Sequence, residues 1–263
     1  MKKSYSNASS VYVNGVQLVT VGCVTGVFSG IAVSVYNVCA SFTEKTAKQI
    51  YEIIRANPIY IPLFLIALLM SAFIFSVAIK IIPMVKGSGI PQTEGATRGM
   101  VRFKWYRDAV AMFAISLLSI FMGLSAGAEG PSVHIGAAMG DGVASVSKRN
   151  EMVRRYQITG GACAGLAIAV GAPMSGMAFA FEEAHKRFTS EVFICAFSSV
   201  IAGMLTKSAV YSLLGLEIHA GFHSFVLSEI PLKDYGFIVL SSIICGCLGV
   251  LLYKSVFGLK RFF

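Results

Sequence analysis

The sequence predicts an all-α membrane protein with several membrane-spanning helices, and three observations support this fold class. Only 13% of the residues are charged, whereas soluble globular domains carry about 25%. The hydrophobic types AVILMFWYC make up 56% of the chain. Long runs contain no Asp, Glu, Lys or Arg, and a membrane-spanning helix needs about 20 predominantly apolar residues. These features exclude a soluble globular domain, a disordered segment and a collagen-like fibre.

Five charge-free runs set the order of the expected helices. They cover Ser4–Thr43, Ala56–Ile79, Ala109–Ala128, Tyr156–Phe181 and Tyr235–Tyr253. Five such runs are too many to be the core helices of one small soluble domain. The chain is therefore expected to be a multi-pass integral membrane protein.

The first run predicts a long helix over about Val11–Phe42, followed by a charged loop over Glu44–Arg55. Gly22, Gly26 and Gly30 recur at four-residue spacing along this helix. Small residues at that spacing let two helix backbones approach closely. We therefore expect this helix to pack tightly against another one.

The second span is expected to begin at Pro58 and to reach about Val85. Apolar runs and prolines set the bounds of the later helices. These are expected at about Trp105–Ser125, Pro131–Val146, Glu151–Ala169, Pro173–Glu183, Ser190–Leu214 and Lys233–Phe257.

The basic residues lie in short connections between the spans, although the formal net charge of +9 would otherwise suggest nucleic-acid binding. Basic loops beside apolar spans are typical of membrane proteins, and anionic lipid headgroups are the expected partners. No basic patch with interleaved aromatic residues lies outside the spans, so nucleic acid is not expected as a partner. His219 and His223 lie in a loop with no third ligand apparent, so no metal site is expected.

Three segments combine small flexible residues with a proline that begins a helical stretch: Gly87–Pro91, Gly127–Pro131 and Gly171–Pro173. Proline is favoured at the start of a helix, where its missing N–H would be unpaired anyway. Helix N-termini at membrane depth hold anions, because their free N–H groups and the helix dipole favour negative charge. A kink or an interhelical loop is the alternative for each break, but three breaks of one type favour a small anion as cargo.

Two residues beside these breaks are candidates for chemistry. Ser88 offers a hydroxyl that can donate to a bound anion, although an ordinary capping serine is the alternative. Glu129 follows 20 charge-free residues and lies at an expected helix start. Its carboxylate can occupy an anion site and leave it on protonation. An acid at the water interface is the alternative.

Glu182 and Glu183 close another charge-free run, of 26 residues. One carboxylate could relay protons along a water-filled pathway while the other pairs with Lys186, one turn further on. Two interfacial acids at a helix end are the alternative. Glu94 is expected to be structural, and His134 to be a packing residue.

These segments also resemble the signature segments of the CLC chloride channels and transporters. The matching residues are Gly87-Ser88-Gly89-Ile90-Pro91, Gly127-Ala128-Glu129-Gly130-Pro131, and Ala172-Pro173 with Glu182-Glu183 at its end. They occur in the family's order and at similar spacing, and the resemblance covers essentially the whole chain.

The resemblance implies roles for individual residues. Ser88, with Gly89, Ile90 and Gly130, would bind chloride, and serine at position 88 implies chloride rather than nitrate or fluoride. Glu129 would be the external gating glutamate, which competes with chloride and accepts protons. Glu183 would be the internal proton glutamate of the family's exchangers.

Two departures from the family pattern stand out. Ala128 replaces the usual Arg or Lys, which should weaken the local positive field. The family's fold has two inverted repeats, and this sequence is similar to the first repeat plus the opening helix of the second. We therefore expect residues 1–263 to form a CLC-type transmembrane domain that is incomplete at its C-terminus.

The resemblance implies chloride/proton antiport by a homodimer with one pathway per subunit, in the cell (inner) membrane. No cofactor is implied, because chloride is the substrate. The alternatives are a passive chloride channel and a split half that works only with a separate C-terminal half. An intramembrane enzyme is not expected, because nothing places Ser88 near a histidine.

Overall fold

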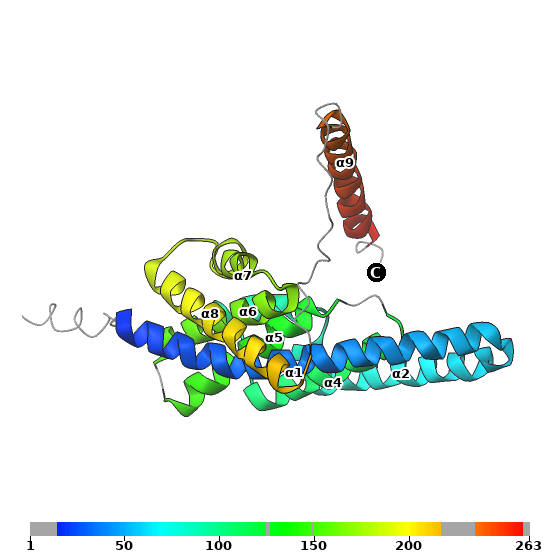
Figure 1. Ribbon diagram of the computed structural model, residues 1–263, viewed down its shortest axis with the longest axis horizontal. Coiled ribbons are helices and arrows are strands. Elements are labelled where there is room, and N and C mark those ends of the chain that lie inside the picture. Colours follow the sequence, from blue (N-terminus) through cyan, green and yellow to red (C-terminus); the bar gives the residue numbers. More distant parts are fainter. Residues whose placement is uncertain (1–14, 125–126, 149, 217–234, 260–263) are drawn as a thin grey trace, which may run out of the picture. The chain divides into compact units, whose positions relative to one another are not determined.

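The computed structural model describes residues 15–124, 127–148, 150–216 and 235–259, and the regular elements among them are all helical (Figure 1). The predicted all-α class is therefore confirmed. The first compact unit contains α1 (Gly15–Ala56), α2 (Ile61–Ile81), α3 (Ile90–Thr97), α4 (Trp105–Phe121), α5 (Glu129–Val146), α6 (Glu151–Val170), α7 (Pro173–Phe179) and α8 (Ser190–Leu213). The described part of the second unit is α9 (Tyr235–Leu259).

Helix α1 is longer than the sequence predicted, and the expected loop over Glu44–Arg55 is wrong. The helix continues to Ala56 because no glycine or proline interrupts the chain after Gly30, and Glu44 pairs with Lys48 at 2.7 Å across one turn. Such pairs support a helix. The helix ends where Asn57, the residue before a proline, leaves the helical region with φ −130° and ψ 89°, since steric contact with the proline ring disfavours the helical conformation.

The close helix contact predicted from the glycine spacing of α1 is present, and its partner is α8 (Figure 1). Methyl groups in place of the Gly26 and Gly30 hydrogens would lie 2.9 and 2.8 Å from side-chain carbons of α8. Ser199 Oγ donates to the Gly22 carbonyl at 2.9 Å. Small residues therefore allow the backbones of these two helices to approach each other closely.

Helices α5 and α6 form the centre of the first unit and cross equally closely. A methyl group on Gly161 would lie 2.9 Å from the Gly136 carbonyl carbon. Ser29 of α1 donates from Oγ to the Gly136 oxygen at 3.1 Å. The position of α5 is thus fixed by close backbone packing on two sides.

Four of the described helices are long and apolar enough to span a membrane: residues 15–56, 58–81, 190–213 and 235–259. The other two charge-free runs behave differently. One begins within α4, which has 17 residues and ends at Phe121, before the run does. The other is divided between α6 and α7 at Gly171, whose φ of 75° belongs to the left-handed region that glycine adopts easily.

The three predicted helix breaks are present, with one difference. Pro173 begins α7, and Pro91 is the second residue of α3. Helix α5, however, starts at Glu129, two residues before Pro131. The stretch expected over Pro173–Glu183 consists of α7 and a π-helical turn, Ala180–Ala184. The loop with His219 and His223 lies outside the described residues.

Candidate functional site

The site begins at the N-terminus of α3. Gly89 precedes this helix with a φ of 85°, a left-handed conformation that glycine adopts without strain. The exposed Ser88 accepts a hydrogen bond at Oγ from the Ile90 N–H at 3.4 Å, a long distance for such a bond. Ser88 therefore has a capping contact, as one interpretation predicted. Its own O–H group has no acceptor among the described residues, so it is still able to donate to an anion.

The N-terminus of α5 packs directly against this segment. A methyl group in place of the Gly130 hydrogen would lie 2.6 Å from Ser88 O and 3.0 Å from Ser88 Cβ. One turn into α5, the buried His134 places Nδ1 3.4 Å from the Gly89 oxygen. The four residues predicted to bind chloride, Ser88, Gly89, Ile90 and Gly130, therefore lie together where two helix N-termini meet.

Glu129 is the first residue of α5 and is exposed beside this junction. A side chain at position 127 would contact the carboxylate of Glu129, and the glycine present there leaves this space to the carboxylate. Glu129 lines a cavity of about 1170 Å³. The other charged or amide side chains that line it are Asn37, Glu44, Lys45, Lys48 and Lys207.

Glu183 lies apart from that cavity, exposed in the π-helical turn that follows α7. Arg98, at the end of α3, donates to the backbone oxygens of Glu183 and Ala184 at 3.3 and 3.5 Å. The same guanidinium lies 3.4 Å from a carboxylate oxygen of Glu94, one turn earlier in α3. In the part of the chain that the structure describes, neither Glu182 nor Glu183 forms an ion pair with Lys186, so that expected pairing is wrong.

Arginines surround His185, just beyond this turn and outside the long apolar spans. His185 Nε2 lies 2.9 Å from Thr159 Oγ1. Burial lowers the pKa of His185, and the nearby Arg187, Arg98 and Arg155 lower it further. The imidazole is therefore neutral at pH 7, and the positive charge at this end of α3 comes from the arginines.

Helix α3 joins the two predicted sites. Its N-terminus meets α5 at the Ser88 junction, and Arg98 at its C-terminus holds the turn with Glu183. Eight residues of α-helix rise about 12 Å. The structure thus brings together Ser88, Gly89, Ile90, Glu129 and Gly130, and links Glu183 to them through one short helix.

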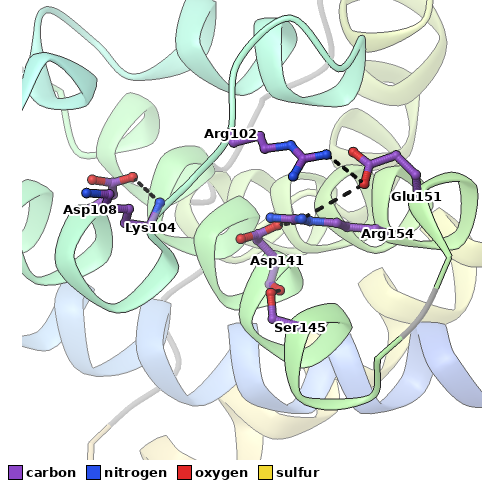
Figure 2. Close-up of polar contacts among 7 residues, drawn as sticks. All are labelled: Arg102, Lys104, Asp108, Asp141, Ser145, Glu151 and Arg154. Carbon is purple, nitrogen blue, oxygen red and sulfur yellow. Dashed lines mark hydrogen bonds and ion pairs between the residues drawn. The ribbon is translucent and has the colours of Figure 1, made fainter.

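An ion-pair network at the opposite end of α5 was not predicted from the sequence. Arg154 Nε lies 2.6 Å from Asp141 Oδ1, and Arg102 and Glu151 extend the network (Figure 2). The Asp141 side chain is 1% exposed. Nearby, Asp108 accepts from the Lys104 N–H at 2.8 Å at the start of α4. This network fixes the C-terminal end of α5 to α6.

Two polar residues within apolar spans were also missed. Lys207 in α8 and Asn37 in α1 both line the cavity beside Glu129. Asn37 accepts a hydrogen bond from Ser132 Oγ at 3.3 Å, which ties α1 to the first turn of α5. A lone ionisable residue inside an apolar span was the available signal for Lys207.

Discontinuous helices whose N-termini meet inside a bundle of long apolar helices are typical of membrane transport proteins. Comparison with known proteins gives the particular family. The model of the voltage gated chloride channel family matches residues 70–263. The chain belongs to this family, which confirms the CLC resemblance. It is an integral membrane protein of a chloride-transport family, not an enzyme.

Several relatives are similar to this chain. The H(+)/Cl(-) exchange transporter ClcA of Vibrio cholerae serotype O1 is 35% identical over 134 residues, which cover 49% of this chain and 29% of the relative. ClcA of Yersinia pestis bv. Antiqua is 29% identical over 201 residues, which cover 76% of this chain and 41% of the relative. The chain thus matches less than half the length of these relatives.

The fold is similar to the crystal structure of a slow cyanobacterial Cl-/H+ antiporter, with a TM-score of 0.73 and 24% sequence identity. The match covers 88% of this chain and 54% of that one. At this identity the likeness shows the fold alone, and the predicted CLC-type architecture is confirmed.

Proposed function

We propose that the protein exchanges chloride for protons across a membrane, as a homodimer with one pathway per subunit, within a CLC-type transmembrane domain. The observation that carries this proposal is the contact of Ser88 with Gly130. It brings the N-termini of α3 and α5 together, with the Glu129 carboxylate beside them. The relatives from Vibrio cholerae and Yersinia pestis support antiport, because they are H(+)/Cl(-) exchange transporters.

Chloride is the expected occupant of this junction. The first N–H groups of each helix have no partner inside the helix, and the dipoles of two helices add their positive ends at one place. The Ser88 O–H supplies a donor without adding a charge. Donors of this kind bind an anion and still release it, whereas a fixed cation in the same place would hold it more tightly.

The two glutamates supply the proton steps. Glu129 competes with chloride while it is ionised and withdraws once it is protonated. Glu183 passes protons between the solution at its end of α3 and the region of Glu129. Arg98 bonds to the backbone of Glu183 and not to its carboxylate, so this arginine does not neutralise the acid.

The test is a paired measurement of chloride and proton flux in proteoliposomes. The chain is expected to move protons against chloride. Glu129→Gln and Glu183→Gln are expected to abolish proton movement while some chloride flux remains. Glu182→Gln is the matched control, with the same substitution one residue away, and should keep coupled flux. Chloride flux without protons in the unmodified protein would favour a passive channel, and intact coupling in Glu183→Gln would contradict the relay.

A second candidate is that this chain transports only together with a separate partner half. The share of its relatives that it spans, 41% for the Yersinia protein, favours this candidate. Flux that is absent from the purified chain and restored by co-expression of a second half would support it. Strong flux from the chain alone would contradict it.

A further inference from the structure

Lys207 is a buried cation in the C-terminal third of the long apolar helix α8. Only 6% of the surface of Lys207 is exposed. Nζ donates to the Ile168 carbonyl at 2.9 Å and lies 5.6 Å from the centre of the Tyr211 ring. Burial of an ammonium group is unfavourable unless it is compensated. The position of Lys207 therefore requires an explanation.

The nearby contacts compensate this charge only in part. Ile168 lies in the last turn of α6, where the helix dipole is negative and carbonyls lack helical partners. The aromatic face of Tyr211 adds a cation–π contact. An ammonium group, however, has three donors, and Ile168 accepts one. No carboxylate of the described residues lies within ion-pair distance of Nζ.

The cavity beside Lys207 has a surplus of positive charge. Its described lining carries three ammonium groups and two carboxylates, a net charge of +1. Glu44 pairs with Lys48 at 2.7 Å, so these two neutralise each other. Lys45 is exposed to solvent. Lys207 is therefore the buried cation of the same cavity that Glu129 lines, and Ala128, which also lines it, carries no charge.

We infer that Lys207 binds chloride in this cavity, at a position outside the junction of α3 and α5. Chloride bound there would then pass to the junction beside Glu129. This inference rests on the proposed chloride transport and adds a further anion-binding residue to it. The remaining N–H donors of the ammonium group bind the anion. Because the group is buried, its field is screened less by salt than that of the exposed Lys45.

Isothermal titration of the purified full chain with sodium chloride measures the affinity directly. Lys207→Met is expected to weaken chloride binding at least about tenfold, since it removes a charge-assisted donor. Lys207→Arg keeps the charge and the donors and is expected to stay within about threefold. Lys45→Met is the matched control, an exposed cation of the same cavity, and should change the affinity less than about twofold.

Lys207→Gln separates anion binding from a purely structural role as a cap of α6. Glutamine keeps an N–H donor for the Ile168 carbonyl but carries no charge. It is expected to preserve the unfolding temperature while chloride affinity falls as in Lys207→Met. Ala128→Lys, added to Lys207→Gln, returns a charge to the same cavity and should restore part of the affinity. Unchanged affinity in Lys207→Gln, or no recovery on adding Ala128→Lys, would overturn the inference.

The outcomes also separate this inference from the proposed function. Chloride binding and transport that are the same with and without Lys207 would contradict the role of Lys207 alone. Chloride binding that depends on Lys207, without any chloride flux, would support Lys207 and contradict the transport proposal. No chloride binding by the unmodified chain would contradict both.

Discussion

The two ends of α5 hold charge in opposite ways. At its C-terminal end, Asp141 is buried and paired with Arg154 at 2.6 Å. At its N-terminal end, Glu129 is exposed to a cavity and has no ion-pair partner among the described residues. A buried, paired charge fixes the position of a helix, because separation of the pair would leave a charge uncompensated. An exposed carboxylate without an ion pair does not fix its helix in this way. One helix thus combines a fixed end with an end whose carboxylate is unpaired among the described residues, as the proposed gating role of Glu129 requires.

The largest effect is expected from breaking the pair at the fixed end. Asp141→Leu leaves Arg154, which is 19% exposed, with only the 4.0 Å contact to Glu151, and this should lower the free energy of unfolding by about 3 kcal/mol. The double variant Asp141→Leu with Arg154→Leu should regain most of this loss. Thermal unfolding of the detergent-solubilised protein measures both. Arg102→Met, which removes a pair that is mostly exposed, is the control and should cost less than about 1 kcal/mol. A double variant as unstable as the single one would show that the pair is not what fixes this end.

The next largest effect on stability is expected where α5 crosses α6, because this close contact fixes the position of α5. Gly161→Val introduces side-chain carbons where the Gly136 carbonyl lies, so unfolding should become easier by about 1–3 kcal/mol. Gly246→Ala is the matched control in α9, where an added methyl group would contact no described atom of its own unit apart from the backbone of its own helix. It should be neutral or stabilising by up to about 1 kcal/mol. Equal stability of both variants in thermal unfolding would argue against close packing at this crossing.

A smaller effect is expected at the N-terminal end of α5, where it meets Ser88. Ser88→Ala removes the hydroxyl donor from the junction of α3 and α5 and should weaken chloride binding about tenfold, the value of one hydrogen bond to a charged group. Stability should hardly change, because the side chain is exposed. Calorimetric titration with chloride measures the affinity. An unchanged affinity would mean that Ser88 is only a capping residue.

The smallest effect is expected at Arg98, which donates hydrogen bonds to the backbone oxygens of Glu183 and Ala184. Arg98→Met removes two long hydrogen bonds and a pair that is partly exposed, so stability should fall by less than about 1 kcal/mol. The ratio of protons to chloride moved should stay the same, because the Glu183 carboxylate is untouched. A changed ratio in the paired flux assay would show that Arg98 takes part in proton transfer.

Much of the fold could be predicted because local chemistry determines it. The prolines and glycines of the three breaks placed the starts of α3, α5 and α7 within two residues of where they lie. The spacing of Gly22, Gly26 and Gly30 predicted a close helix contact. The continuation of α1 through Glu44–Arg55 was missed because charged residues suggested a loop, whereas pairs one turn apart support a helix equally well.

The candidate site was predictable in its parts but not in its assembly. Ser88 and Glu129 each stood at an expected helix start, which local patterns can show. That Ser88 touches Gly130 depends on how α3 and α5 pack, which no local pattern determines. Lys207 and the pair of Asp141 with Arg154 were missed for the same reason, since burial and partners arise only when the helices come together.

The most direct test of the central claim is to locate the anion. Crystals of the protein grown in bromide, a heavier stand-in for chloride, reveal bound halide through its anomalous scattering. The account predicts a bromide peak at the junction of α3 and α5, within hydrogen-bonding distance of Ser88 Oγ. Well-ordered crystals with bromide peaks elsewhere, and none at this junction, would contradict it.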